Sequence, residues 1–231
     1  MSLFTSLNSY KGTAFEVIII VFGVMLSFLL NEIRLDLDDK DEAISTLQQI
    51  KNDLEKDLYD TNYNLPLEEF NYKAIKSLIE HFEDEKPYDK SMDRTFGSLI
   101  EWTHFLPSTT GLQIINSKGV DYIENDSLRI KFLELHNYMY EERLMHFSVF
   151  RDGLLLMKNF FAKNFTQTFN QYIEAKATPN NYNELMVNAY FNNLLFFIYN
   201  GHSNLFYTDN QIKIKILEII PLVDEEIIKL Q

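Results

Sequence analysis

Among the side chains able to bind a metal ion, Glu101 and His104 have the most suggestive spacing. They form an E-x-x-H pattern, which di-iron helical bundles present on two of their helices. The sequence contains no second copy of the pattern. Glu142 and His146 would lie one helical turn apart, but their charged neighbours favour a solvent-exposed helix face. We therefore expect no metal ion and no other cofactor.

The other residue types used in catalysis are absent or isolated. His81, His136 and His202 have no partners nearby in sequence and are interpreted as surface residues or as hydrogen-bonded core residues. The absence of cysteine excludes disulfides, thiolate metal sites and a cysteine nucleophile. The sequence also lacks a Gly-rich phosphate loop, a G-x-S-x-G turn and an H-E-x-x-H motif. No catalytic residue is predicted, and an enzyme is the least favoured class of function.

Glu16 is the acidic residue with the most unusual surroundings. It stands near the start of the apolar run 14–30, AFEVIIIVFGVMLSFLL, and no further ionisable residue occurs until Glu32. One interpretation is a carboxylate in the first turn of a helix, where the helix dipole favours negative charge. The other is a protonatable group of a channel or pump, because acidic residues inside membrane spans are often functional. The position of Glu16 at the edge of the run favours the first interpretation.

The run itself predicts a membrane anchor, because a spanning helix needs about 20 mostly apolar residues and tolerates as few as about 17. A cleaved signal peptide is disfavoured, since the run ends without small residues that would form a cleavage site. An interfacial or buried helix is the remaining alternative. The predicted organisation is an N-terminal tail over residues 1–13, a transmembrane anchor over 14–31 and a soluble helical-bundle domain over 32–231. Residues 14–30 would contact the membrane.

The orientation of the anchor depends on few charges. Basic groups close to the run are nearly balanced, with Lys11 and the N-terminal amine before it and Arg34 and Lys40 after it. We favour an N-terminus that stays inside, as in a signal-anchor protein, and a body that is exported. The net charge of −13 argues against nucleic acid as a partner of the body, because nucleic-acid binding requires cationic patches.

The composition of the body predicts an all-α fold. Hydrophobic residues make up 46% of the chain, which is enough for a core. With only seven glycines and five prolines, the chain is poor in the turns that sandwiches and barrels need. We find no internal repeat, no linker and no alternation long enough to indicate a sheet.

One long amphipathic helix is predicted to continue the anchor, from residue 13 to residue 61. Apolar residues follow a heptad pattern along it, interrupted by Lys40 and Lys51. This stripe permits self-association as a parallel coiled coil. The alternative, which we favour slightly, is that later helices of the same chain cover it. The members of the stripe are Leu30, Ile33, Leu37, Ile44, Leu47, Leu54 and Leu58.

Two prolines and a glycine divide the first part of the body. Pro66 suits the first turn of a new helix over residues 67–83. Another helix is expected over residues 91–104. The segment Pro107-Ser108-Thr109-Thr110 is interpreted as a helix start, with Ser108 as cap chemistry, and Gly119 as the stop of that helix, where a positive φ is expected.

The second half of the body is predicted to be helical almost throughout. Asn125 and Asp126 offer an N-cap for a long run over residues 127–177. A further helical stretch is expected over residues 182–206. Breaks are expected at a turn over residues 179–181, at Gly201 and at Asp209 as the cap of the last helix. Pro221 should produce a kink or a new helix start.

Two segments together resemble a known family. The first is the span itself, Phe15 to Phe28 followed by Leu30-Asn31-Glu32, and the second is P-S-T-T-G-L-Q-I-I-N-S-K-G over residues 107–119 followed by I-E-N-D-S-L-R over 123–129. The pair resembles uncharacterised bacterial single-pass membrane proteins that carry a domain of unknown function. The resemblance implies an anchored helical protein of the bacterial inner membrane, with a periplasmic body under the orientation above and no established activity. Gly111 departs from the family pattern.

Two classes of function remain. The first is a membrane-anchored, non-catalytic helical scaffold or accessory subunit that binds a protein partner or self-associates through the long helix. The second is a subunit of an ion-coupled membrane complex that uses Glu16 near one end of the span. Substitution of Glu16 by Gln would distinguish them, because only the ion-coupled subunit should lose function.

Overall fold

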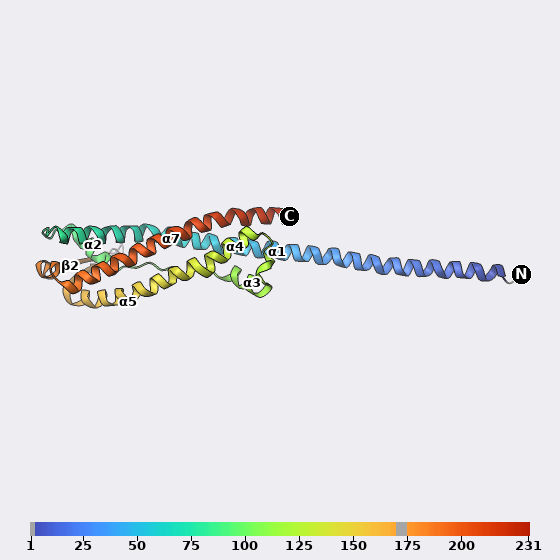
Figure 1. The fold of residues 1–231 in the computed structure, drawn as a ribbon, viewed down its shortest axis with the longest axis horizontal. Helices are drawn as coiled ribbons and strands as arrows, with labels where there is room; N and C mark the ends of the chain where they lie inside the picture. The colour runs from blue at the N-terminus through green and yellow to red at the C-terminus, as the bar shows by residue number, and fades with distance from the viewer. Residues whose placement is uncertain (1–2, 170–174) are drawn as a thin grey trace.

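The computed structural model describes residues 3–169 and 175–231, with side chains for 16–168 and 175–231. The fold is all-α, as predicted. A very long first helix, α1 (Leu3–Glu83), packs along most of its second half against the last helix, α7 (Ala189–Leu230). The two helices run antiparallel, and the first half of α1 projects alone from the bundle (Figure 1). The C-terminus lies near the point where α1 leaves the bundle (Figure 1).

The heptad stripe of α1 is divided by the bundle into a covered and an uncovered part. Leu47 and Leu54 are buried in a core to which α7 also contributes, which confirms for this part that the chain covers its own stripe. Leu30, Ile33 and Leu37 are exposed. Self-association through the long helix therefore stays a prediction for the uncovered part only.

The predicted helix break at Pro66 is wrong, since α1 continues through Pro66 to Glu83. A proline inside a helix removes one N–H donor and leaves the carbonyl four residues earlier without its partner. That residue, Asn62, is exposed, as is Pro66, so water can satisfy the free carbonyl. Leu65 and Glu68 on the opposite face are buried and hold both turns against the rest of the protein. Packing outweighs the local preference of the proline.

The segment after α1 is less helical than expected. A 3-10 turn, η1 (Lys90–Met92), and the short helix α2 (Asp93–Ser98) are followed by residues 99–109, which we call the strap. The predicted helix over 91–104 is therefore wrong beyond Ser98. Burial alternates along the strap, with Thr103 and Phe105 inward and their neighbours outward. This period of two is that of an extended chain.

The next helix, α3 (Thr110–Lys118), ends where the sequence predicted. Gly119 follows it with a φ of +100°, which confirms the positive φ. Its ψ of 144° lies outside the left-handed helical region, in a region that only glycine adopts readily. A 3-10 turn, η2 (Val120–Tyr122), follows directly.

The run after Asn125 begins as predicted and ends earlier. It consists of α4 (Asp126–Glu134), a π-helical turn η3 (Leu135–Tyr140) and α5 (Glu141–Asn164). The helical prediction to residue 177 is wrong, because β1 (Phe165–Phe169) and β2 (Ala175–Pro179) form an antiparallel hairpin with Phe165 opposite Pro179. The alternation F-T-Q-T-F in β1 is typical of a strand but is too short to outweigh the helical run before it.

The last part of the chain is a short helix, α6 (Tyr182–Met186), followed by the continuous α7. The expected break at Gly201 and the helix start at Asp209 are wrong, and Pro221 lies inside the helix. Gly201 serves close packing instead, because a Cβ there would lie 2.1 Å from the Phe150 ring of α5. Gly153 of α5 has the reciprocal role, with a Cβ 2.0 Å from the ring of Phe197.

Two apolar cores fill the bundle. The hairpin-side core lies near the β-hairpin, and the stalk-side core lies near the point where α1 enters the bundle. The first includes Ile75, Phe96, Phe150, Phe161 and Phe191. The second includes Leu54, Ile115, Phe132, Ile212 and Val223.

Candidate functional site

A layer of buried polar side chains lies between the two apolar cores. It contains Glu68 from α1, Thr103 from the strap, Arg143 from α5, and His202 and Asp209 from α7, which we call the polar layer. All five side chains are buried, and hydrogen bonds connect all of them. Four separate parts of the chain therefore meet at this level of the bundle.

The hydrogen bonds of the polar layer start from the guanidinium group. Arg143 Nε donates to Asp209 Oδ1 at 2.7 Å, and Nη2 lies 3.3 Å from the Thr103 hydroxyl. The Thr103 hydroxyl in turn donates to a carboxylate oxygen of Glu68. The other oxygen of Glu68 is 2.7 Å from Nδ1 of His202.

The charges of the polar layer are far from water. Burial raises the pKa of Asp209 to about 6, even though the Arg143 guanidinium opposes the rise. Arg143 also lies over the rings of Phe105 and Phe147, each at 5.9 Å from the ring centroid. Buried ion pairs contribute little net stability but are strongly destabilising when one partner is removed. The polar layer is therefore suited to fixing the register of the four segments.

Two aspartates of α1 hold the start of α3. Asp57 accepts a hydrogen bond from the Ser108 backbone N–H at 2.9 Å, and Asp53 accepts one from the Gly111 N–H at 2.7 Å. They satisfy N–H groups that a helix start leaves free, and their negative charge suits the helix dipole. The close approach explains Gly111, because a Cβ there would lie 2.7 Å from Cγ1 of Ile50.

The same aspartates extend into a second buried polar group. Tyr140 donates to Asp57 at 2.7 Å. Burial raises the pKa of Asp57, and the hydrogen bonds from Tyr140 and Ser108 oppose this rise. His136 packs edge-on against the Tyr140 ring at 4.9 Å, and its buried Nε2 has no partner among the described residues. Burial lowers the pKa of His136 to about 4.

The E-x-x-H residues of the sequence do not converge. Glu101 forms two hydrogen bonds of 3.0 Å with Arg94, and His104 accepts one from the Trp102 indole N–H at 2.7 Å. Both residues lie on the non-helical strap. His146 contacts Thr208 rather than Glu142. Within the side chains that the structure describes, no group of three or more His, Asp or Glu residues is arranged to hold a metal ion.

The remaining residues singled out in the sequence have structural positions. Ser108 is buried beside Asp57, and Gly119 ends α3. The N-cap of α4 is Asn125, which accepts from the Leu128 N–H, whereas Asp126 occupies the first helical position and pairs with Arg129 at 2.6 Å. Pro66 lies inside α1.

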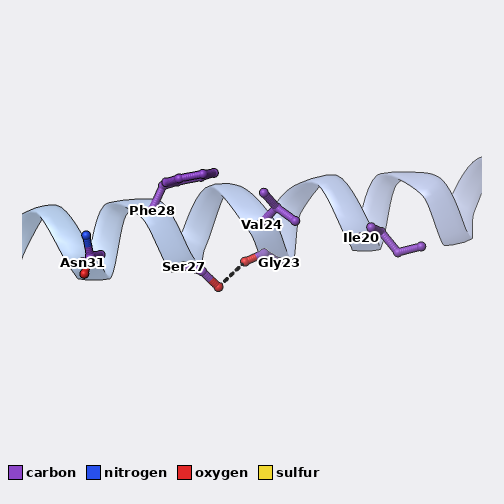
Figure 2. A pocket seen from close by; sticks show the side chains of 6 residues that line it. All are labelled: Ile20, Gly23, Val24, Ser27, Phe28 and Asn31. Atoms are coloured by element: carbon purple, nitrogen blue, oxygen red, sulfur yellow. Dashed lines mark hydrogen bonds between the residues drawn. The ribbon is translucent and has the colours of Figure 1, made fainter.

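The apolar run of α1 carries a shallow groove on one helix face. Figure 2 shows that all six lining residues come from this single helix. Within the groove, the Ser27 hydroxyl donates to the Gly23 carbonyl at 2.8 Å. Glu16 lies at the N-terminal end of the run and is exposed. The lining residues are Ile20, Gly23, Val24, Ser27, Phe28 and Asn31.

The polar layer was missed in the sequence because its members look ordinary one by one. From the sequence alone, Asp209 is interpreted as a helix cap and Arg143 as part of a charged surface. A helical projection gives one usable signal: Asp209 lies on the same face of α7 as Leu205 and Ile212, both of which are buried. A charge within an apolar face indicates a buried partner.

No family model, curated protein or solved structure matches the chain.

Proposed function

We propose that this protein is a membrane-anchored, non-catalytic helical scaffold or accessory subunit that holds its bundle at a fixed distance from a lipid bilayer. The observation that carries the proposal is the continuity of α1. One helix contains both the exposed apolar run and the buried stripe of the stalk-side core. A single rigid element thus joins the proposed anchor to the body.

The exposed apolar run supports a bilayer as its surroundings. One described helix is long and apolar enough to span a membrane, with a mean hydropathy of 2.1 over 18 residues and none of that window buried in the protein. Phe22 and Phe28 are 67% and 71% exposed. A core helix of a soluble protein would bury such side chains, since each contributes about 1.5–3 kcal/mol when removed from water.

A helical stalk separates this run from the bundle. It comprises residues 31–41, because Glu42 already pairs with Lys118 of α3 at 2.6 Å and Thr46 is the first buried side chain of α1 in the described part of the chain. At 1.5 Å per residue the stalk is about 16 Å long. The surface of the stalk is strongly acidic. Arg34 forms a weak ion pair with Asp38 at 3.6 Å. The stalk would keep the bundle clear of the lipid headgroups.

The enclosure of the polar layer supports a role by contact rather than by catalysis. Asp209 and Glu68 are fully buried, and both already have polar partners within the protein. Catalytic groups must reach a substrate, usually in a cleft. The outer surface of the bundle is then what a partner would meet. We place the protein in a bacterial inner membrane with the bundle in the periplasm, following the sequence resemblance and the preferred orientation.

Carbonate extraction of cell membranes tests the anchor. Full-length protein should stay with the membrane pellet and require detergent for release. Phe22→Arg, which puts a charge at the middle of the run, should release a large part of the protein. The matched control is Ile130→Arg, at an exposed position on α4, which should leave the protein in the pellet. Release of the full-length protein by carbonate alone would refute the anchor.

Reporter fusions test the orientation separately. A reporter that is active only after export should work when fused after Gln231 and fail when fused at the N-terminus. The reverse pattern would place the bundle in the cytoplasm while leaving the anchor itself intact.

A further inference from the structure

An open pocket of about 390 Å³ lies between α1 and the strap. Asp60 and Tyr63 contribute from α1, and Trp102 and Leu106 from the strap. The buried Thr103 belongs to the same lining and joins the pocket to the polar layer. The other lining residues are Asn64, Leu67 and His104.

The walls of the pocket are held in place before any ligand binds. The side chain of Asn64 donates to the His104 carbonyl at 2.6 Å, which fixes the strap on α1. The Trp102 indole N–H donates to Nε2 of His104 at 2.7 Å, which orients the indole ring. A preformed site loses less conformational entropy on binding.

Asp60 gives the pocket an unbalanced negative charge. It is half-buried, and the described side chains provide it with no hydrogen bond and no ion pair. The half-buried Glu101 and the buried Glu226, by contrast, have cationic partners in Arg94 and Lys229. Lys158 of α5 lies 3.5 Å from the Trp102 ring centroid and forms no ion pair with Asp60. Among the described residues, the Asp60 carboxylate is therefore not engaged and is available to a cation from outside the chain.

Aromatic faces beside a carboxylate favour a cation of organic type. The ring quadrupole of Trp or Tyr attracts ammonium and guanidinium groups, and Trp102 already receives one such group from Lys158. The pocket is continuous with exposed apolar side chains, since Tyr63 is 75% exposed, Leu106 74% and Tyr59, one turn before Tyr63, 71%. Clusters of Tyr and Trp around one charge are typical of protein interfaces.

We propose that this pocket binds a lysine or arginine side chain of a partner protein, with the cation paired to Asp60 and lying against Tyr63 and Trp102. The inference rests on the proposed scaffold function, because it identifies the surface that the scaffold offers. The net charge of −13 adds long-range attraction for a basic partner. Tyr59 and Leu106 would contact the residues that flank the inserted side chain.

Trp102 is the only tryptophan of the chain, so its fluorescence reports on the pocket directly. Full-length protein in nonionic detergent micelles is titrated with the peptide acetyl-Gly-Lys-Gly-amide. We expect a saturable change in fluorescence with this peptide and weaker binding of acetyl-Gly-Gln-Gly-amide. Asp60→Asn should reduce the affinity for the Lys peptide about tenfold or more. Tyr63→Ala should also weaken binding, whereas Tyr138→Ala, at another exposed tyrosine that lies on η3, should not.

The possible results separate clearly. Equal binding of the Lys and Gln peptides, or an unchanged affinity of Asp60→Asn with native helicity, would overturn the proposal. Tighter binding of tetramethylammonium than of the Lys peptide would assign the pocket to a small quaternary ammonium ligand instead and would equally overturn the proposal. If Asp60→Asn loses its helicity, the proposal is tested by comparing the peptide affinities of Tyr63→Ala and Tyr138→Ala. Carbonate extraction is independent of this pocket, so failure of the anchor and failure of the pocket are distinguishable.

Discussion

Replacing His136 by leucine should make the stability of the bundle less sensitive to acid. The imidazole is buried, packs edge-on against Phe132 at 4.5 Å, and has an Nε2 without a partner among the described residues. Burial lowers the pKa of His136 from an ordinary 6.5 to about 4. Because the unfolded chain binds the proton more tightly, the neutral imidazole contributes its full stability above pH 6.5, and this contribution is lost as the pH falls toward 4.

The size of the effect follows from that difference in pKa. A lowering of about 2.5 corresponds to about 3 kcal/mol of unfolding free energy lost by the wild type between pH 6.5 and pH 4. Leucine has no titrating group, so the variant lacks this loss. At pH 7.5 the two proteins should differ by only about 1 kcal/mol, because leucine fills a similar volume and removes an unpaired nitrogen.

Urea unfolding of the full-length protein in nonionic detergent, followed by far-UV circular dichroism between pH 7.5 and pH 4, measures both curves. His81→Gln, at a histidine that is only partly covered, is the matched control and should follow the wild type. Parallel curves for wild type and His136→Leu would refute the reasoning. Parallel curves would mean that protonation of His136 costs the folded protein no stability. Burial would then not lower the pKa of His136.

Other predictions concern the buried pairs and the turn at Gly119. Arg143→Met should lower the unfolding free energy by about 3–5 kcal/mol, because it leaves buried carboxylates without a cation, and adding Asp209→Leu should recover part of the loss in urea unfolding. Asp57→Ala should cost about 1–3 kcal/mol and speed amide hydrogen exchange at Ser108, whose N–H loses its acceptor. Gly119→Val should cost about 1–3 kcal/mol in thermal unfolding through its φ of +100° alone, since no atom lies within 4 Å of a Cβ there, and an unaffected Gly119→Val would show that the turn relaxes freely.

Local signals in the sequence predicted the features that depend on neighbouring residues. The apolar run, the all-α composition and the end of α3 at Gly119 all belong to this group. The capping of α4 was predicted with both Asn125 and Asp126 as candidates, and the structure assigns the N-cap to Asn125. Each of these features is decided within a few residues, where helix propensity and backbone conformation dominate.

Features decided by distant contacts were not predictable in the same way. Pro66 indicates a helix break locally, but burial of the opposite face of α1 keeps the helix intact. The polar layer is the strongest case, because Arg143 meets an acid 66 residues away and His202 meets one 134 residues away. A single sequence carries no record of such pairing, so its charged residues look like surface residues.

Because α1 is uninterrupted, the stalk fixes the rotation of the bundle about the helix axis as well as its distance from the apolar run. Each residue of an α-helix turns the chain by about 100° and advances it by only 1.5 Å. The number of residues between Leu30 and Leu47 therefore sets which side of the bundle faces in the same direction as Gly23 and Ser27 on the apolar run. Deleting one stalk residue would swing the aromatic pocket by more than a quarter of a turn while scarcely changing its height, whereas deleting seven would lower it by about 10 Å and nearly preserve its direction. The number of stalk residues thus sets the rotational orientation of the bundle about the helix axis. A partner held beside the span would be affected by a change in this orientation before it was affected by a change in distance.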